Sequence, residues 1–139
     1  MPLQPSPSPS TRRVLVIDDE QTIRIALRRF FSRMGWAVEE APDGEAGLAI
    51  LMHEPEGQSR FTLVLSDLRM PGLSGIDLYD RLRVVRPRTI DRMVFSTGDL
   101  VSEDAAAFVE ATRCVVLQKP FELSALRELA ERLASSNES

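Results

Sequence analysis

The sequence predicts an α/β fold, an open doubly wound sandwich in which helices cover both faces of a five-stranded parallel sheet. Short apolar runs alternate with segments of helical periodicity from Arg13 onward, as in sheets built with crossover helices. The runs are short and mostly apolar, which is expected where helices cover both sides of the sheet. The length of 139 residues corresponds to one domain.

The two ends of the chain predict no packed structure. Residues 1–11 alternate Pro and Ser, which removes backbone donors and offers no apolar face. We therefore expect a disordered tail or interdomain linker over 1–11, a folded domain over 12–135 and a disordered C-terminus over 136–139.

Five short apolar runs predict the strands, and the segments between them have the apolar spacing of helices. The predicted strands are Val14–Asp18, Ala37–Glu40, Leu63–Ser66, Met93–Ser96 and Cys114–Leu117. The first helix has an inner face of Ile23, Leu27, Phe30 and Met34 and ends at Gly35. The other predicted helices are Gly44–His53, Gly75–Val85, Ser102–Ala111 and Glu122–Ala134.

Polar residues lie at the carboxyl ends of four predicted strands. They are Asp18 and Asp19 at the first, Asp67 at the third, Thr97 at the fourth and Lys119 at the fifth. Ligands of open doubly wound sheets bind at this edge. The sequence therefore predicts that these five side chains form one site.

Three neighbouring carboxylates repel one another and require a cation. Oxygen ligands of this kind favour a hard divalent ion, and Mg²⁺ commonly uses one or two carboxylates while keeping several waters. A carboxylate such as Asp67 can also attack phosphorus to form an acyl phosphate. Thr97 would then bond a phosphoryl oxygen, and Lys119 would place a point charge on the phosphate.

Each of these residues also has an ordinary structural interpretation. Asp19 could cap the first helix, Asp67 and Thr97 could stabilise turns, and Lys119 could be a surface charge. Their placement on successive strand ends favours the site. Lys119 is also the only Lys among 17 basic residues, which suggests a task that the planar guanidinium of Arg does not perform.

Composition excludes several other classes of function. The net charge of −4 argues against nucleic-acid binding by this chain, and no apolar run is long enough to cross a membrane. The first residues lack a secretory signal, and the single Cys114 allows no internal disulfide. We expect a protein of the cytoplasm.

Four segments resemble the signature regions of response-regulator receiver domains, in the family's usual order: VLVIDDE, LVLSDLRMPGLSG, VFSTGD and VLQKPF. The resemblance covers about residues 13–134. It implies a flavodoxin-like (βα)5 fold with strand order 2-1-3-4-5. It also implies a signalling domain of a two-component system that assists its own phosphorylation and dephosphorylation and is not an enzyme with its own substrate.

The resemblance also assigns roles to the site residues. A histidine kinase or phosphotransfer protein would donate a phosphoryl group to Asp67. Asp67, Asp19 and the backbone carbonyl of Arg69 would bind Mg²⁺, with Asp18 acting mainly through a metal-bound water. Lys119 would pair with a phosphoryl oxygen and precede a cis peptide to Pro120, and Thr97 would move toward the phosphoryl group.

Output would use the face made by the fourth helix, fifth strand and fifth helix. The family usually has an aromatic residue three positions before the Lys, where this chain has Val116, so the usual readout is open to question. Gly98 follows Thr97 where a small residue with a methyl is common, which predicts a shorter-lived acyl phosphate. Ile25 lies on the outer side of the first helix, the helix that faces the kinase in this family, and is a candidate docking contact.

Two alternatives remain open from the sequence. A phosphatase with an aspartyl nucleophile would need a second carboxylate two residues after Asp67, where the chain has Arg69. A receiver-like interaction module that is never phosphorylated would not need Asp67, Thr97 and Lys119 intact. A related question is whether the domain acts alone or belongs to a hybrid histidine kinase.

Overall fold

The computed structural model describes residues 12–55 and 60–138, so the predicted tail over 1–11 lies outside the described part. Five strands form one parallel sheet in the order β2-β1-β3-β4-β5, which confirms the predicted fold class. The strands are β1 (Arg13–Ile17), β2 (Ala37–Ala41), β3 (Leu63–Asp67), β4 (Met93–Thr97) and β5 (Val116–Gln118).

Six helices are present in the described residues, one more than the sequence predicts. They are α1 (Gln21–Arg33), α2 (Gly44–Met52), α3 (Gly75–Val85), α4 (Pro87–Ile90), α5 (Glu103–Thr112) and α6 (Leu123–Glu138). The additional helix α4 is a single turn that begins at Pro87, a residue favoured at the first helical position. None of these helices, within the described residues, has the length and apolar character needed to span a bilayer.

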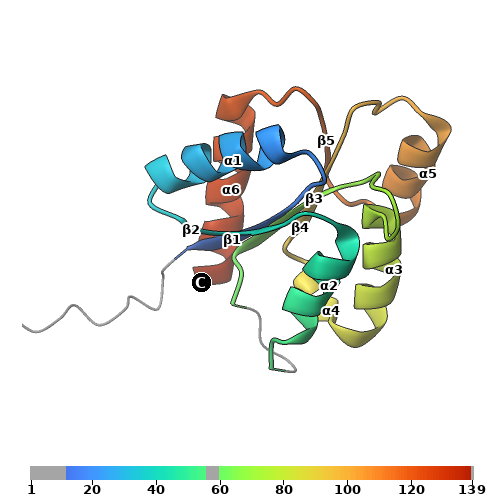
Figure 1. The fold of residues 1–139 in the computed structure, drawn as a ribbon, viewed down its shortest axis with the longest axis horizontal. Helices are drawn as coiled ribbons and strands as arrows, with labels where there is room; N and C mark the ends of the chain where they lie inside the picture. Colours follow the sequence, from blue (N-terminus) through green and yellow to red (C-terminus); the bar gives the residue numbers. More distant parts are fainter. Residues whose placement is uncertain (1–11, 56–59, 139) are drawn as a thin grey trace, which may run out of the picture.

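The helices form two layers, one on each face of the sheet (Figure 1). Helices α1 and α6 cover one face, where their apolar residues pack against Val14, Val16 and Leu63 of the sheet. Helices α2, α3 and α5 cover the other face, where the core includes Leu15 and Phe95. Alternate residues of each strand therefore point into different cores.

Side chains at the helix N-termini position three helices of the second layer. The carboxylate of Asp43 accepts a hydrogen bond from Ala46 N at the start of α2. Ser74 and Asp77 form a capping box at the start of α3, and Ser102 caps α5. Each cap satisfies amide donors that the helix itself leaves unpaired. Helices α3 and α5 thus begin at defined residues beside the carboxyl edge of the sheet.

Two predicted boundaries are wrong. The fifth strand begins at Val116 and not at Cys114, because Arg113 adopts a left-handed conformation with φ of 63° and Thr112 Oγ1 accepts a hydrogen bond from Cys114 N. Helix α6 continues to Glu138, beyond the predicted end of this helix at Ala134. No Gly or Pro interrupts this segment, and such residues commonly end a helix. Residue 139 lies outside the described part.

Candidate functional site

The five predicted site residues lie at the carboxyl edge of the sheet. Asp67 and Thr97 are the last residues of β3 and β4, Asp18 follows β1 directly, and Lys119 follows β5 directly. Because β1, β3, β4 and β5 are adjacent and parallel, their carboxyl ends meet at one edge. The topology therefore brings together residues that are up to 101 positions apart in the chain.

Lys119 bridges two of the carboxylates. Its Nζ donates to Asp18 Oδ2 at 2.9 Å and to Asp67 Oδ2 at 3.1 Å. Asp18 is 2% exposed and Asp67 7% exposed, so both pairs are shielded from water. Buried charges require such partners. The only Lys of the chain therefore neutralises the centre of the acidic cluster.

Asp19 completes a group of three carboxylates that could hold a metal ion. One carboxylate oxygen from each of Asp18, Asp19 and Asp67 lies within 4.8 Å of the other two. Asp19 is exposed and provides an open side to this group. Oxygen-only ligands with access for water suit Mg²⁺, so the residues present fit the ion that the sequence predicts.

Asp19 does not cap helix α1, and its two neighbours form the turn that precedes the helix. The N-terminal cap position of α1 is Glu20, which makes no side-chain cap hydrogen bond. Instead, Asp18 Oδ1 accepts a hydrogen bond from Glu20 N at 2.9 Å, an Asx-type turn. Arg24 donates to the Asp18 carbonyl at 2.6 Å. Asp18 thus has one carboxylate oxygen in the turn and the other on Lys119, while Asp19 is free of a helix-capping role.

The electrostatic environment perturbs Asp67 and Lys119. Burial raises the pKa of Asp67 above its ordinary value, and the charge and hydrogen bond of Lys119 only partly oppose this effect. Burial alone would lower the pKa of Lys119, but the hydrogen bond to Asp18 and the charge of Asp67 outweigh it and raise the pKa. Lys119 therefore stays cationic at neutral pH. The raised pKa of Asp67 means that a further cation would stabilise its ionised form.

Thr97 is held beside this cluster by backbone contacts. It is 1% exposed, its Oγ1 accepts a hydrogen bond from Asp99 N at 3.2 Å, and its carbonyl accepts one from Lys119 N at 2.8 Å. The peptide bond between Lys119 and Pro120 is cis, as the resemblance implied. These contacts connect the ends of β4 and β5.

Arg69 has a side-chain role that the sequence does not reveal. Its amide N donates to Asp67 Oδ1 at 3.4 Å, whereas its guanidinium donates to Ser102 Oγ at 3.2 Å and to Asp104 Oδ2 at 3.1 Å. Ser102 and Asp104 lie 33 and 35 positions away along the chain, so no local pattern indicates the contact. The side chain therefore links the loop after β3 to the start of α5. The predicted metal-binding role of its carbonyl stays a prediction.

Gly75 is a second residue whose importance only the structure reveals. A Cβ at this position would lie 2.3 Å from the carbonyl oxygen of Asp67, closer than atoms can approach. The first residue of α3 must therefore be Gly for the helix to begin against the end of β3. In the sequence, Gly75 is indistinguishable from an ordinary helix-start glycine.

The sequence matches the profile of the response regulator receiver domain over residues 14–131. The chain belongs to this family. Receiver domains are signalling domains of two-component systems, and the predicted family is therefore confirmed.

Two relatives illustrate the range of the family. The chain is 28% identical to sporulation initiation phosphotransferase F of Bacillus subtilis over 122 residues, which covers 86% of this chain and 91% of the relative. It is 35% identical to the response regulator MprA of Mycolicibacterium vanbaalenii, covering 87% of this chain and 48% of MprA. The receiver thus spans about half the length of the MprA relatives.

Solved structures share the fold. The response regulator TrrA of Thermotoga maritima, whose structure is a complex with Mg²⁺ and BeF, has a TM-score of 0.72 to this chain and 24% identity. The alignment covers 88% of this chain and 98% of that one. At this identity the likeness concerns the fold.

Val116 and Gly98 are the two positions that depart from the family pattern, and the structure shows what surrounds each of them. Val116 is half-buried in β5 and pairs in register with Phe95 of β4. Phe95, Tyr79 and Phe108 form a set of edge-to-face aromatic contacts with ring centroids 5.0 to 6.5 Å apart. Gly98 is exposed, and a Cβ added there would meet no atom within 4 Å. The space beside the site is therefore open at Gly98.

Proposed function

We propose that this receiver accepts a phosphoryl group on Asp67 from a phosphohistidine of a histidine kinase or phosphotransfer protein. The observation that carries the proposal is the convergence of Asp67 with Asp18, Asp19 and Lys119 at one edge of the sheet. Such a cluster combines a nucleophile, ligands for a divalent cation and a fixed positive charge. Phosphoryl transfer depends chiefly on positioning and charge neutralisation of this kind.

The reaction forms one bond and breaks another. A carboxylate oxygen of Asp67 attacks phosphorus, the bond from phosphorus to the histidine nitrogen breaks, and the imidazole leaves with the electron pair. Mg²⁺, held by Asp19, Asp67 and the Arg69 carbonyl with Asp18 acting through a water, would neutralise charge on the phosphoryl oxygens. Lys119 would exchange its bond to Asp67 for one to a phosphoryl oxygen, while its bond to Asp18 keeps the ammonium in place.

The signal would leave the site through β5, α5 and α6. Thr97 would donate a hydrogen bond from its hydroxyl to a phosphoryl oxygen. This movement would change the hydrogen bond that Thr97 Oγ1 accepts from Asp99 N. Val116 replaces the usual aromatic residue, so aromatic rotation within β5 cannot transmit this change. The direct link between the site loop and α5 is the bond from Arg69 to Ser102 and Asp104. We infer that the readout uses the position of α5.

The deciding experiment compares the wild type with Asp67→Asn by intact mass after incubation with Mg²⁺ and acetyl phosphate. The wild type should gain one phosphoryl group, and Asp67→Asn should gain none. A matched control is Asp80→Asn, which removes an exposed carboxylate of α3 and should leave the adduct unchanged. A wild type that gains no adduct at any Mg²⁺ concentration would contradict the proposal and favour a module regulated without phosphorylation.

The same assay separates the phosphatase alternative. Steady turnover of phosphoesters would support it. The structure offers no carboxylate two residues after Asp67, where the Arg69 guanidinium instead contacts α5. One phosphoryl group bound per chain, followed by slow loss, is the expected result. We expect Gly98→Ala to slow that loss by about twofold or more, because a methyl group would fill open space beside the acyl phosphate.

The donor would approach across α1. Ile25 is 43% exposed on this helix, and Ile25→Asp should slow transfer from the donor protein while leaving transfer from acetyl phosphate unchanged. Equal slowing with both donors would contradict a docking role. We further propose that residues 12–135 are the receiver domain, that residues 1–11 are a tail or interdomain linker, and that the protein acts in the cytoplasm.

A further inference from the structure

The side chain of Gln118 joins the end of β5 to the loop between β4 and α5. Its Oε1 accepts a hydrogen bond from Leu100 N at 2.8 Å, and its Nε2 donates to the Gly98 carbonyl at 2.7 Å. The same Nε2 donates to the Lys119 carbonyl at 3.1 Å. Because the carboxamide oxygen can only accept and its nitrogen can only donate, a single orientation of the group satisfies all three bonds. Gln118 therefore holds residues 98–100 in one position relative to β5.

The position of Gln118 places this contact beside Thr97. The two residues are register partners in the pairing of β4 with β5, and Thr97 leads directly into the loop that Gln118 holds. The other residues of β5 are Val116 and Leu117, whose side chains have no hydrogen-bonding group. Gln118 is therefore the one residue of β5 whose side chain can hold the loop by hydrogen bonds.

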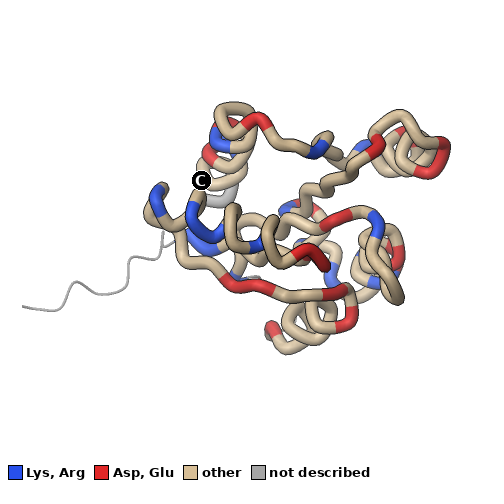
Figure 2. Tube along the Cα trace, turned by 45° about the horizontal axis from the view of Figure 1, so that its top comes forward, with Lys and Arg blue, Asp and Glu red and all other residues tan. Residues whose placement is uncertain are grey.

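The same loop leads to α5, where a second contact holds it. Arg69 donates to Ser102 and Asp104, and Figure 2 shows acidic residues in the first turn of this helix. Gln118 is exposed, so water can replace its hydrogen bonds when the loop moves. The contact is thus specific in geometry and can be released at low cost. A displacement of residues 98–100 away from β5 breaks it.

We propose that Gln118 is a positioning residue for Thr97 and acts as a latch of the unphosphorylated receiver. With the latch closed, residues 98–100 lie against β5, and Thr97 Oγ1 accepts its hydrogen bond from Asp99 N. When Thr97 moves toward the phosphoryl group, residues 98–100 follow because they are its direct continuation, and the bonds from Gln118 to this segment break. The freed segment then lets α5 change position. The inference rests on the proposed function and names the contact through which the site would control α5.

The test compares two substitutions that each remove side-chain hydrogen bonds near β5. Gln118→Met keeps a side chain of similar length and removes all three hydrogen bonds of Gln118. Thr112→Val is the matched control at the opposite end of α5, where Thr112 Oγ1 donates to the Phe108 carbonyl at 2.7 Å and accepts from Cys114 N at 3.1 Å. Intact mass after incubation with Mg²⁺ and acetyl phosphate gives the phosphorylated fraction of each protein. Solvent exchange of the Leu100 amide is then measured by NMR with and without acetyl phosphate and compared at equal phosphorylated fraction.

Before phosphorylation, the Leu100 amide of the wild type should exchange at least about tenfold more slowly than that of Gln118→Met, which lacks its acceptor. Phosphorylation should raise Leu100 exchange by about fivefold or more in the wild type. It should leave the exchange unchanged in Gln118→Met, where the latch is already open. Thr112→Val should follow the wild type at Leu100 in both states, because its lost bonds lie at the other end of α5.

Equal exchange of Leu100 in the free and the phosphorylated wild type would overturn the latch while leaving the phosphorylation of Asp67 intact. The same holds if Gln118→Met keeps the full response to phosphorylation, or if Thr112→Val changes Leu100 exchange as much as Gln118→Met does, since a general loosening of the fold would then explain the result. Failure of Gln118→Met to be phosphorylated would also overturn it, because Gln118 would then serve the transfer itself. If acetyl phosphate does not label the wild type, the phosphoacceptor role fails and the latch proposal fails with it.

Discussion

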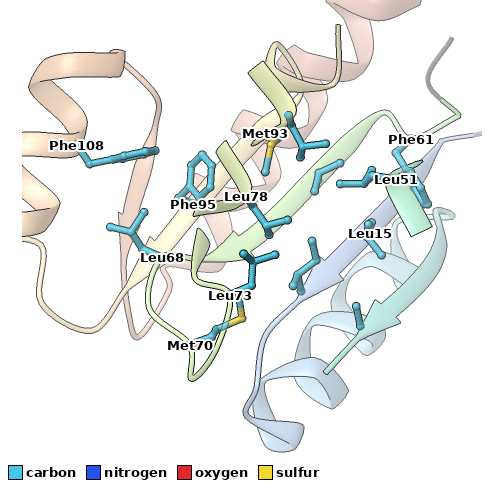
Figure 3. Packing of buried hydrophobic residues seen from close by; sticks show 14 of the residues in the cluster. Leu15, Leu51, Phe61, Leu68, Met70, Leu73, Leu78, Met93, Phe95 and Phe108 are labelled. Carbon is cyan, nitrogen blue, oxygen red and sulfur yellow. The ribbon is translucent and has the colours of Figure 1, made fainter. Parts of the chain in front are cut away.

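The layer formed by α1 and α6 and the helix α5 on the opposite face are held to the same sheet in different ways. Helix α1 buries Leu27, Phe30 and Phe31, and α6 adds Leu126, Ala130 and Ala134 to the same core. Helix α5 buries only Ala105 and Phe108. Figure 3 shows Phe108 extending from α5 toward Phe95, and the ring centroids of these two residues lie 5.0 Å apart.

The polar contacts show the same contrast. The ion pairs of Lys119 with Asp18 and Asp67 are buried, whereas Arg69 and Asp104, which tie α5 to the site loop, have side chains that are 53% and 70% exposed. Exposed pairs contribute little to stability. The carboxyl edge of the sheet and the layer formed by α1 and α6 are thus held by buried contacts, and α5 is the element that can change position at low cost.

Truncation of one buried Phe in each region should give the largest difference in stability between the α1/α6 layer and α5. Phe31 of α1 is fully buried, so Phe31→Ala should lower the free energy of unfolding by about 3–5 kcal/mol. Phe108→Ala should cost about 1–3 kcal/mol, because α5 can open without the rest of the fold. Urea denaturation measures both values. Faster amide exchange confined to α5 in Phe108→Ala would support the comparison, and a global loss equal to that of Phe31→Ala would refute it.

Mg²⁺ should stabilise the receiver without fixing α5. The proposed side-chain ligands follow β1 or end β3, so bound ion should raise the free energy of unfolding by about 2.7 kcal/mol at a hundredfold excess over its dissociation constant. Thermal denaturation in Mg²⁺ and after chelation measures the shift. Asp19→Ala changes an exposed side chain and should abolish the shift while keeping the unliganded stability. A full shift in this variant would exclude Asp19 as a ligand.

The pH dependence of stability should report on Asp67. Its pKa is raised in the folded protein, chiefly by burial, so the ionised carboxylate destabilises the fold and protonation relieves that cost. Without Mg²⁺, Asp67→Asn should be more stable than the wild type at neutral pH. The difference should shrink as pH falls through the folded pKa toward about 4. Urea denaturation at several pH values measures it.

The opposite result has a defined meaning. If Asp67→Asn is less stable at neutral pH, the ion pair with Lys119 outweighs the cost of burying Asp67. Lys119 keeps its bond to Asp18 in the variant, so the comparison removes one partner and not both. The carboxyl edge of the sheet would then gain part of its stability from the Asp67 carboxylate.

The smallest effect is expected at the link to α5. Arg69→Met removes an exposed ion pair and should change stability by less than about 1 kcal/mol. It should nevertheless increase amide exchange in the first turn of α5, because Ser102 and Asp104 lose their partner. Arg83→Met is a matched control that removes the exposed pair with Asp80 inside α3. Unchanged exchange in α5 would show that Arg69 does not hold this helix.

The sequence by itself determined the layers of the fold and the edge at which the site residues meet. Alternating apolar runs and helical spacing are local patterns, and the parallel arrangement places the residues after successive strands together. Asp18, Asp19, Asp67, Thr97 and Lys119 could therefore be selected without coordinates. The resemblance of four motifs added their order and their expected roles.

Only the tertiary structure decided how these elements are coupled. The contact of Arg69 with α5 and the close approach of Gly75 to Asp67 each bring together residues on different elements. No local pattern specifies such distances. The delayed start of β5 likewise depends on the turn at Arg113 and on the hydrogen bond from Cys114 N to Thr112 Oγ1, which override the apolar character of the segment. Local preferences determine which elements form, whereas packing determines how firmly each one is held.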